Sequence, residues 1–175
     1  SSDVYMGFGH NVLSATTAFG NSATTHNEWG YATQGREGSE VYQGNDSDID
    51  AQSYVTLDNW SGTATSSAYG VGNASTISNV GSDTGLNAIQ NNYGTVTSTA
   101  SLSGASPSAG DGIVTSTAIG NAATATLCNV CGDAALYGRT QQFNNGSVIA
   151  QGSGSVGQTG HIFGSATAVG NSSTY

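Results

Sequence analysis

Residues 116–126 read STAIGNAATAT, an uncharged stretch whose one large side chain is Ile119 and whose centre is a Gly-Asn pair. The same pattern, a leading alanine followed within a few residues by Gly-Asn, occurs four times, with the leading alanines at Ala18, Ala68, Ala118 and Ala168. Successive leading alanines are 50 residues apart. A fixed period of about 20 to 50 residues is typical of repeat architectures. The chain is therefore predicted to be an array of similar structural units.

The period divides the 175 residues into repeats of about 50 residues at 11–60, 61–110 and 111–160, with a partial fourth at 161–175. Residues 1–10 lie outside this pattern and are predicted to form an N-terminal extension, a candidate donor strand. Residues 11–175 are predicted to form the repeat domain. The predicted rung positions share alanine, glycine or asparagine and are Ala18, Gly20, Asn21, Ala68, Gly72, Asn73, Ala118, Gly120, Asn121, Ala168, Gly170 and Asn171.

Local patterns favour strands throughout the repeats. Residues 95–100 and 114–119 are rich in β-branched side chains and are bounded by Gly, Asn or Ser, as half-buried strands are. No window keeps apolar residues at helical spacing. With 26 glycines and a single proline, the turns are expected to be made by Gly and Asn, which tolerate positive φ. The predicted fold class is all-β.

A second series of alanines, Ala51, Ala100 and Ala150, follows the leading alanines by 32 or 33 residues and precedes the next ones by 17 or 18. This spacing indicates that each repeat contains three coils of about 16 to 18 residues. We therefore predict a parallel β-solenoid of about ten short coils, with alanine in a narrow interior and asparagine side chains stacked in ladders at equivalent turns. The larger rung residues are expected to stack or to line one face (Phe19, Tyr69, Ile119 and Val169). A β-sandwich and a disordered chain are the alternatives, because both use short strands or Gly/Ser/Thr-rich segments.

Charge excludes one class of partner. The chain has 2 basic and 11 acidic residues, a net charge of -9, so binding to nucleic acid is not expected. No stretch approaches the roughly 18 apolar residues that cross a bilayer, so no membrane span is expected.

Two residue clusters are candidate chemical sites. Asp46, Asp48 and Asp50 alternate, which would place their carboxylates on one face of a strand, where Ca²⁺ could bridge them; a solvated acidic face is the alternative. Cys128 and Cys131 are expected to form a local disulfide, with a metal site, a redox motif and two free thiols as alternatives. No other cofactor is expected.

Catalytic signals are weak. Glu28 with Glu37 or Glu40 could form the carboxylate pair of a glycosidase, and histidines occur beside many serines, but no nucleophile motif accompanies them. The protein is not expected to be an enzyme.

The two ends of the array resemble each other: residues 9–18 and 160–168 align with one gap. A last layer that copies the first can receive another molecule head to tail, which gives a filament rather than a closed ring. The expected partner is another copy of the chain. The predicted interface residues are Val4, Tyr5, Met6, Phe8, Val12 and Leu13 at one end and Ile162, Phe163, Val169 and Tyr175 at the other.

Residues 142–151 (QFNNGSVIAQ) resemble the curlin-type repeats of bacterial surface fibres, which space Gln, Gly, Asn and Ala in a similar way. The Ala-x-Gly-Asn rungs, as at 118–121, are similar to those of holdfast-attachment proteins. The 50-residue period is longer than a curlin repeat, and the Cys128–Cys131 pair is foreign to it. The resemblance implies an exported, extracellular β-solenoid fibre subunit or adhesin, with no catalytic residues to carry over.

The leading hypothesis is therefore a secreted or cell-surface structural protein that polymerises head to tail by β-edge pairing. The second is a monomeric solenoid that binds ice or a surface polysaccharide through a Thr- and Tyr-rich face. The third is a carbohydrate-active enzyme built on a β-helix.

Overall fold

The computed structural model describes residues 1–36, 38–104, 110–128, 134–157 and 160–175, and it contains three parallel sheets. Sheet A consists of β1 (Ser2–Met6), β5 (Ile49–Leu57), β8 (Val96–Gly104) and β11 (Val148–Val156). Sheet B consists of β2 (Gly9–Glu28), β6 (Trp60–Val80), β9 (Asp111–Cys128) and β12 (Ile162–Thr174). Sheet C consists of β3 (Ala32–Gln34), β4 (Val41–Asn45), β7 (Thr84–Asn92) and β10 (Leu136–Asn144). Across these ranges, no helix is long and apolar enough to cross a membrane.

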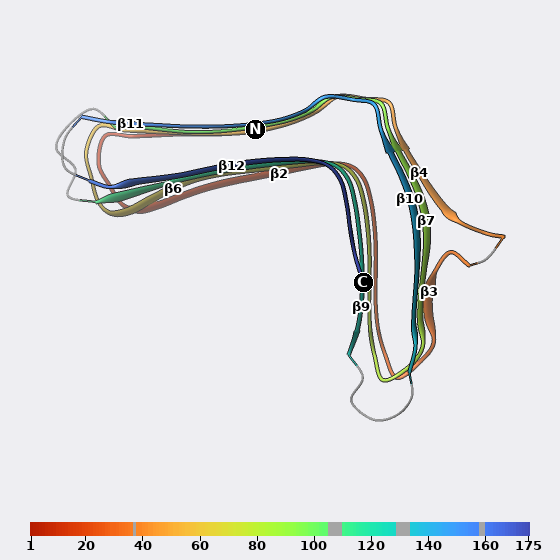
Figure 1. Cartoon of the computed structure of the whole chain (residues 1–175). Helices are drawn as coiled ribbons and strands as arrows, with labels where there is room; N and C mark the ends of the chain where they lie inside the picture. Colours follow the sequence, from red (N-terminus) through yellow and green to blue (C-terminus); the bar gives the residue numbers. More distant parts are fainter. Residues whose placement is uncertain (37, 105–109, 129–133, 158–159) are drawn as a thin grey trace.

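The chain visits the sheets in the order A, B, C and then returns to A one layer further along the stack (Figure 1). Every pairing between strands of adjacent layers is parallel; for example, Asn73 of β6 pairs with Asn121 of β9. The predicted parallel β-solenoid is confirmed. The prediction of about ten short coils is wrong, because one 50-residue repeat makes one coil and its three alanine-marked parts are the strands of three different sheets. The stack is four layers deep in sheets A and B, so it is about 15 Å thick rather than a longer rod.

Each coil has the outline of an L when viewed along the stack (Figure 1). In the long arm, sheet A packs against the first half of sheet B; in the short arm, sheet C packs against the second half. The strands of sheet B are long enough, with 20 residues in β2 and 21 in β6, to pass through both arms and to bend where the arms meet. The bend coincides with the repeated Gly-Asn pair.

Close packing at the bend explains the glycine of this pair. A Cβ atom on Gly72 would lie 2.5 Å from the Oδ1 atom of Asn92 and 2.5 Å from the backbone oxygen of Gly120. Real Cβ atoms do not approach other atoms so closely, so any larger residue would push the outer wall of the corner away. Gly72 and Gly120 thus allow the inner strand to contact the turn that follows sheet C.

The asparagine of the pair forms a ladder that runs through the whole stack. The side-chain amide of Asn21 donates to Asn73, that of Asn73 to Asn121, and that of Asn121 to Asn171, each over 2.8 Å. Asn73 and Asn121 are fully buried. A buried amide costs free energy unless its donors and acceptors are paired, and identical residues in register pair them layer by layer. The asparagine ladder that the sequence predicted at the Asn-containing turns is a separate one, and it is confirmed through Asn45, Asn92 and Asn144.

Two further ladders stabilise the turn between sheets C and A. Asn45 donates to Asn92 over 2.7 Å and Asn92 to Asn144 over 2.8 Å, while Gln142 donates to Gln90 and Gln90 to Gln43. The same amide nitrogen of Asn92 also donates to the backbone oxygen of Gly94, which closes the turn. Amide ladders therefore line both sides of the corner.

The leading alanines are not all equivalent in the structure. Ala18 pairs with Gly70, not with Ala68, whereas Gly70 pairs with Ala118 and Ala118 with Ala168. The ladder asparagines show the reason, because they are separated by 52, 48 and 50 residues instead of a constant 50. A shift of two residues keeps the same face of the strand inward, so Ala68 remains buried. The prediction that Ala68 occupies the same rung as the other three is wrong.

Small residues fill the interior, as predicted. The core of the long arm is formed by Val12, Ala51, Val55, Leu57, Trp60, Ala64, Ala68, Ala100, Leu102 and Val114. The core of the short arm is formed by Ala32, Ile77, Leu86, Ala88, Ala123 and Ala125. Buried serines bridge the two walls of the long arm, as where Ser66 donates to Ser53 and Ser116 to Ser98. The larger rung residues lie on the outer face, and the rings of Phe19 and Tyr69 meet edge to face at 6.0 Å.

The N-terminal segment belongs to the first coil. β1 pairs in parallel with β5, with Val4 opposite Val55. Residues 2–6 are therefore a strand of sheet A and not an extension outside the repeat.

Replacing Asn121 by Ala should lower the free energy of unfolding by roughly 2–4 kcal/mol, because three buried or half-buried hydrogen bonds to Asn73, Asn171 and the oxygen of Phe143 would lose their partner. Urea denaturation followed by circular dichroism measures this. Asn171→Ala at the exposed end of the ladder is the matched control, with an expected loss below about 1 kcal/mol. Equal losses for the two variants would contradict a stabilising ladder.

Replacing Gly72 by Ala should destabilise the protein by about 2 kcal/mol or more, because the new methyl group would overlap the corner. Gly164→Ala is the control, since a Cβ atom there meets no atom within 4 Å. We expect the control to be neutral or slightly stabilising in the same denaturation assay. A Gly72→Ala variant as stable as the control would show that the corner has room for a side chain.

Candidate functional site

The two ends of the stack are open sheet edges. β1 and β2 form the outer strands at the first coil, and β11 and β12 form them at the last coil. An outer strand presents backbone N–H and C=O groups that can pair with another strand. The strands β11 and β12 contain no Asp, Glu, Lys or Arg, which are the residues that usually prevent such pairing.

The inner row of side chains is uncovered at the last coil. Ala118 of the third coil is fully buried, with 0% of its surface exposed. Ala166 and Ala168, which lie in the same inner row one layer further along, are exposed. The last coil therefore presents interior-type residues to its surroundings.

The asparagine ladder has a direction. Each amide nitrogen donates to the layer on its C-terminal side, from Asn21 through to Asn171. The ladder thus ends in an amide oxygen at the first coil and in an exposed amide nitrogen at Asn171. An acceptor at one end and a donor at the other are complementary in a head-to-tail contact.

A recess of about 700 Å³ opens at the first coil, in the short arm. Edge residues of β2 form one wall, and β4 with the following turn forms the other. The lining residues are Asn21, Ser22, Ala23, Val41, Tyr42, Gln43, Gly44, Asp46 and Tyr93.

The structure separates the predicted interface residues into the two end coils. Six lie in the first coil (Val4, Tyr5, Met6, Phe8, Val12 and Leu13) and four in the last (Ile162, Phe163, Val169 and Tyr175). Val4, Val12 and Ile162 point inward and pack with the core of the long arm. Leu13 and Phe163 are exposed, at 71% and 60%. Because strand side chains stand perpendicular to the direction of stacking, these two residues project from the sides of the coil.

Tyr5 is held at the side of the first coil by Asp58. Its hydroxyl donates to the Oδ2 atom of Asp58 over 3.0 Å. This hydrogen bond, together with the negative charge of Asp58, raises the pKa of Tyr5 above its ordinary value. Tyr5 is therefore neutral throughout the physiological pH range.

The candidate cation site is not assembled. Asp46, Asp48 and Asp50 are exposed; Asp48 accepts a hydrogen bond from the backbone nitrogen of Thr95 over 2.7 Å, and Asp50 accepts one from Gln52. Among the residues with described positions, no group of three or more His, Cys, Asp or Glu side chains could hold a metal ion. The hypothesis of a Ca²⁺ site at these residues is not supported by the geometry.

The candidate disulfide falls partly outside the described residues. Cys128 ends β9, and its backbone oxygen accepts a hydrogen bond from Gly81 over 3.0 Å, but Cys131 lies in the segment 129–133. The pairing of Cys128 with Cys131 stays a prediction. Glu37, one of the weak glycosidase candidates, also lies outside the described residues.

Sequence reasoning did not single out Arg36 and Arg139. Both line one hollow on the outer face of sheet C. The available signal was that they are the two basic residues of the whole chain. Their common location could not be inferred without the register that joins residues about 50 positions apart.

The chain matches the family model of HfaD, holdfast attachment protein D, over residues 1–95. The match spans the first two coils, β1 to β7, including the Gly-Asn corners of both. No curated protein and no solved structure matches the chain. Since the family model covers more than half of the 175 residues, this protein belongs to the holdfast attachment protein D family.

Proposed function

We propose that this protein is a structural subunit of holdfast adhesion that assembles head to tail with further copies of itself through its open end coils. Membership of a holdfast attachment family indicates an adhesive role and a cell-surface or extracellular location. The observation that carries the assembly is the uncovered inner row at Ala166 and Ala168, which continues a row that is buried one layer below.

In the proposed contact, the first coil of one copy lies on the last coil of another as if it were the next layer. β2 pairs with β12 and β1 with β11, in the parallel register that the stack already uses. Ala18 then covers Ala168, and the amide nitrogen of Asn171 donates to the amide oxygen of Asn21. The ladder continues across the boundary without a break.

The long arm would carry most of this contact. Sheets A and B have four layers along the stack, whereas sheet C has three, with β10 as its outer strand on the side of the last coil. When β1 and β2 are placed on β11 and β12, one layer of sheet C is missing between the copies, so β10 of one copy and β3 and β4 of the next lie two strand spacings, about 9.6 Å, apart. The recess beside β4 lies at this gap.

Backbone pairing and burial of small side chains, not charge, would hold the copies together. The strands of the last coil have no Asp, Glu, Lys or Arg. Each backbone hydrogen bond contributes about 0.5–1.5 kcal/mol, and a contact across two sheets makes many of them. Assembly should therefore change little with ionic strength. A contact of this kind between different surfaces does not close and yields an open filament.

Replacing Ala168 by Lys should block assembly, because the proposed contact would bury the ammonium group in the inner row beneath Ala18. The fold of the single copy should be unaffected, since Ala168 is exposed at the end of the stack. Sedimentation velocity and negative-stain electron microscopy of the purified protein measure the assembly state.

Thr167→Lys is the matched control, because the neighbouring residue lies on the same strand and is equally exposed but points to the outer face. It should assemble like the unaltered protein. Filaments of Ala168→Lys as long as those of Thr167→Lys would disprove stacking through the last coil, and an unaltered protein that stays a single copy at high concentration would disprove assembly altogether.

A further inference from the structure

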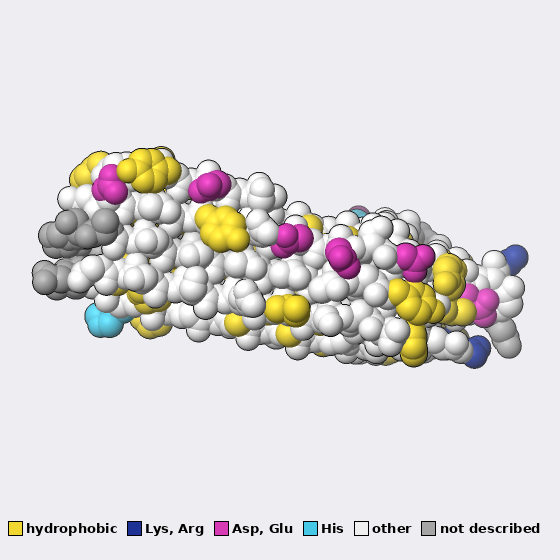
Figure 2. Space-filling view, turned by 90° about the horizontal axis from the view of Figure 1, so that it is seen from above, with side chains coloured by type: hydrophobic (Ala, Val, Ile, Leu, Met, Phe, Trp, Pro, Cys, Tyr) yellow, Lys and Arg dark blue, Asp and Glu magenta, His cyan; other side chains and the backbone are white. Residues whose placement is uncertain are grey.

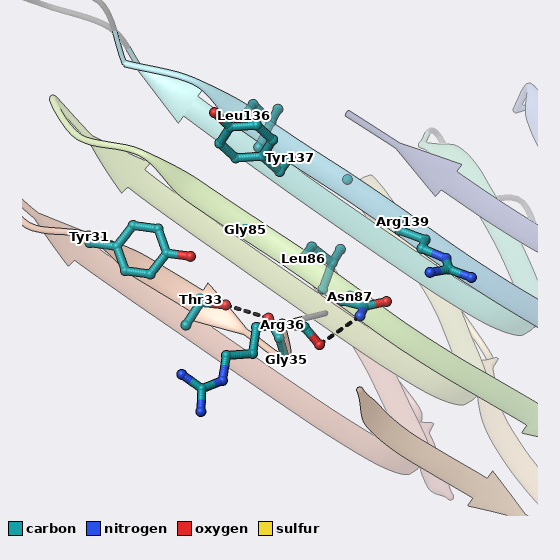
Figure 3. A pocket seen from close by; sticks show the side chains of 11 residues that line it. Tyr31, Thr33, Gly35, Arg36, Gly85, Leu86, Asn87, Leu136, Tyr137 and Arg139 are labelled. Carbon is teal, nitrogen blue, oxygen red and sulfur yellow. Dashed lines mark hydrogen bonds between the residues drawn. The ribbon is translucent and has the colours of Figure 1, made fainter. Parts of the chain in front are cut away.

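A second feature, distinct from the end coils, is a hollow of about 630 Å³ on the outer face of sheet C (Figure 3). It crosses the strands β3, β7 and β10, so three successive coils contribute to it. Tyr31 and Tyr137 stand on either side of it; Arg139 lies at one end, and the side chain of Arg36 projects away on the side of β3. The hollow faces sideways and stays accessible in an end-to-end assembly.

The position of Arg36 results from an insertion in the first coil. Gln34 pairs with Leu86 and Val41 with Ala88, so residues 35–40 stand opposite the single residue Asn87. The described part of this extra chain leaves the sheet beside β3 and β4 (Figure 1), and Arg36 and Ser39 form a β-bridge within it. Gly35, with a φ of 70°, begins the loop, and Asn87 donates to the backbone oxygen of Arg36 over 2.9 Å. The loop is thereby tied to the second coil.

The floor of the hollow is open because of glycine. Thr33, Gly85 and Tyr137 occupy the same position in three successive layers. A Cβ atom on Gly85 would lie 3.3 Å from the Oγ1 atom of Thr33 and 3.5 Å from the hydroxyl oxygen of Tyr31. Gly85 therefore leaves a gap between two tyrosine rings that are 65% and 62% exposed, for Tyr31 and Tyr137.

Both basic residues of an acidic protein line the hollow. Arg36 and Arg139 are the two basic residues of a chain with a net charge of -9. Figure 2 shows basic side chains only toward the end of the molecule formed by the short arm, whereas acidic side chains are spread along its length. Arg139 pairs in register with Asn87, whose amide also lies 3.5 Å from the Oε1 atom of Glu40. The polar side chains of Asn87 and Glu40 therefore lie in the region between the two arginines.

We propose that this hollow binds a carboxylate-bearing glycan, such as a polymer that contains uronic acids. The planar guanidinium groups of Arg36 and Arg139 match the geometry of sugar carboxylates. The exposed rings of Tyr31 and Tyr137 offer flat apolar surfaces with hydroxyl groups at their edges, which suits the faces of sugar rings, and the gap at Gly85 admits a ring between them.

The same features disfavour an acidic peptide. A peptide rich in Asp and Glu has no flat rings to fill the space between the tyrosines. A uronic-acid oligomer repeats its carboxylates along the chain, so different units can reach Arg36 and Arg139 while their ring faces pack on the tyrosines. The proposal does not depend on head-to-tail assembly, because no residue of the end-coil contact lines the hollow.

Isothermal titration calorimetry with oligogalacturonate as the probe tests the proposal, with a neutral malto-oligosaccharide and poly-glutamate as comparisons. The unaltered protein should bind oligogalacturonate, and the double variant Arg36→Gln/Arg139→Gln should bind it at least about tenfold more weakly. Tyr137→Ala should also weaken binding severalfold. Tyr54→Ala, on the outer face of sheet A, is the matched control and should bind like the unaltered protein.

Circular dichroism and the thermal unfolding midpoint report whether each variant keeps its fold; the arginine side chains project from the surface, so both should be unchanged. Three results would overturn the proposal: no binding of oligogalacturonate by the unaltered protein, equal binding by a folded double-arginine variant, or tighter binding of poly-glutamate than of oligogalacturonate. Equal binding of the neutral oligosaccharide would show that the arginines do not select the ligand. Loss of filaments in the Ala168→Lys variant should leave the glycan affinity unchanged.

Discussion

Side-chain amides placed in register are the constraint on which the rest of this structure depends. A buried asparagine side chain needs hydrogen-bond partners for its amide nitrogen and its amide oxygen. At the bend of this fold, the equivalent asparagines of the next and the preceding layer supply them. Asn73 and Asn121 meet this condition, each bonding to an equivalent residue in the next coil. The condition fixes the register of the strands on either side, and with it the position of every side chain that points into the two arms.

The thin interior accounts for the unusual composition. Ala, Ser and Val fill much of the space between the two sheets, and the largest fully buried side chains are those of Trp60, Leu57, Ile77, Leu86 and Leu102. Serine in such a place must find partners, and Ser53, Ser66, Ser98 and Ser116 bond to one another or to backbone oxygens across the arm. Charged residues remain on the outer faces, where they do not interrupt the stack.

The sequence was sufficient to predict the all-β class, the parallel solenoid and the asparagine ladder, because these follow from a pattern that recurs along the chain. The number of coils was predicted wrongly. Ala51 and Ala100 echo the leading alanines because every strand of this protein faces a narrow interior, not because each echo starts a coil. Ala68 was misaligned because the second coil reaches its bend two residues later. The hollow on sheet C combines Arg36 from a loop insertion with Arg139 two layers away, and periodicity alone cannot predict an insertion.

The arrangement of one layer per 50 residues has a mechanical consequence for an adhesive protein. A coil occupies only about 5 Å along the stack, yet its chain, once peeled away and stretched, would span on the order of 170 Å. Under tension an end coil could therefore detach and lengthen more than thirtyfold while the remaining coils stay folded. A tether built in this way would lengthen under a sudden pull as an end coil unfolds, and it would absorb work before any covalent bond is strained.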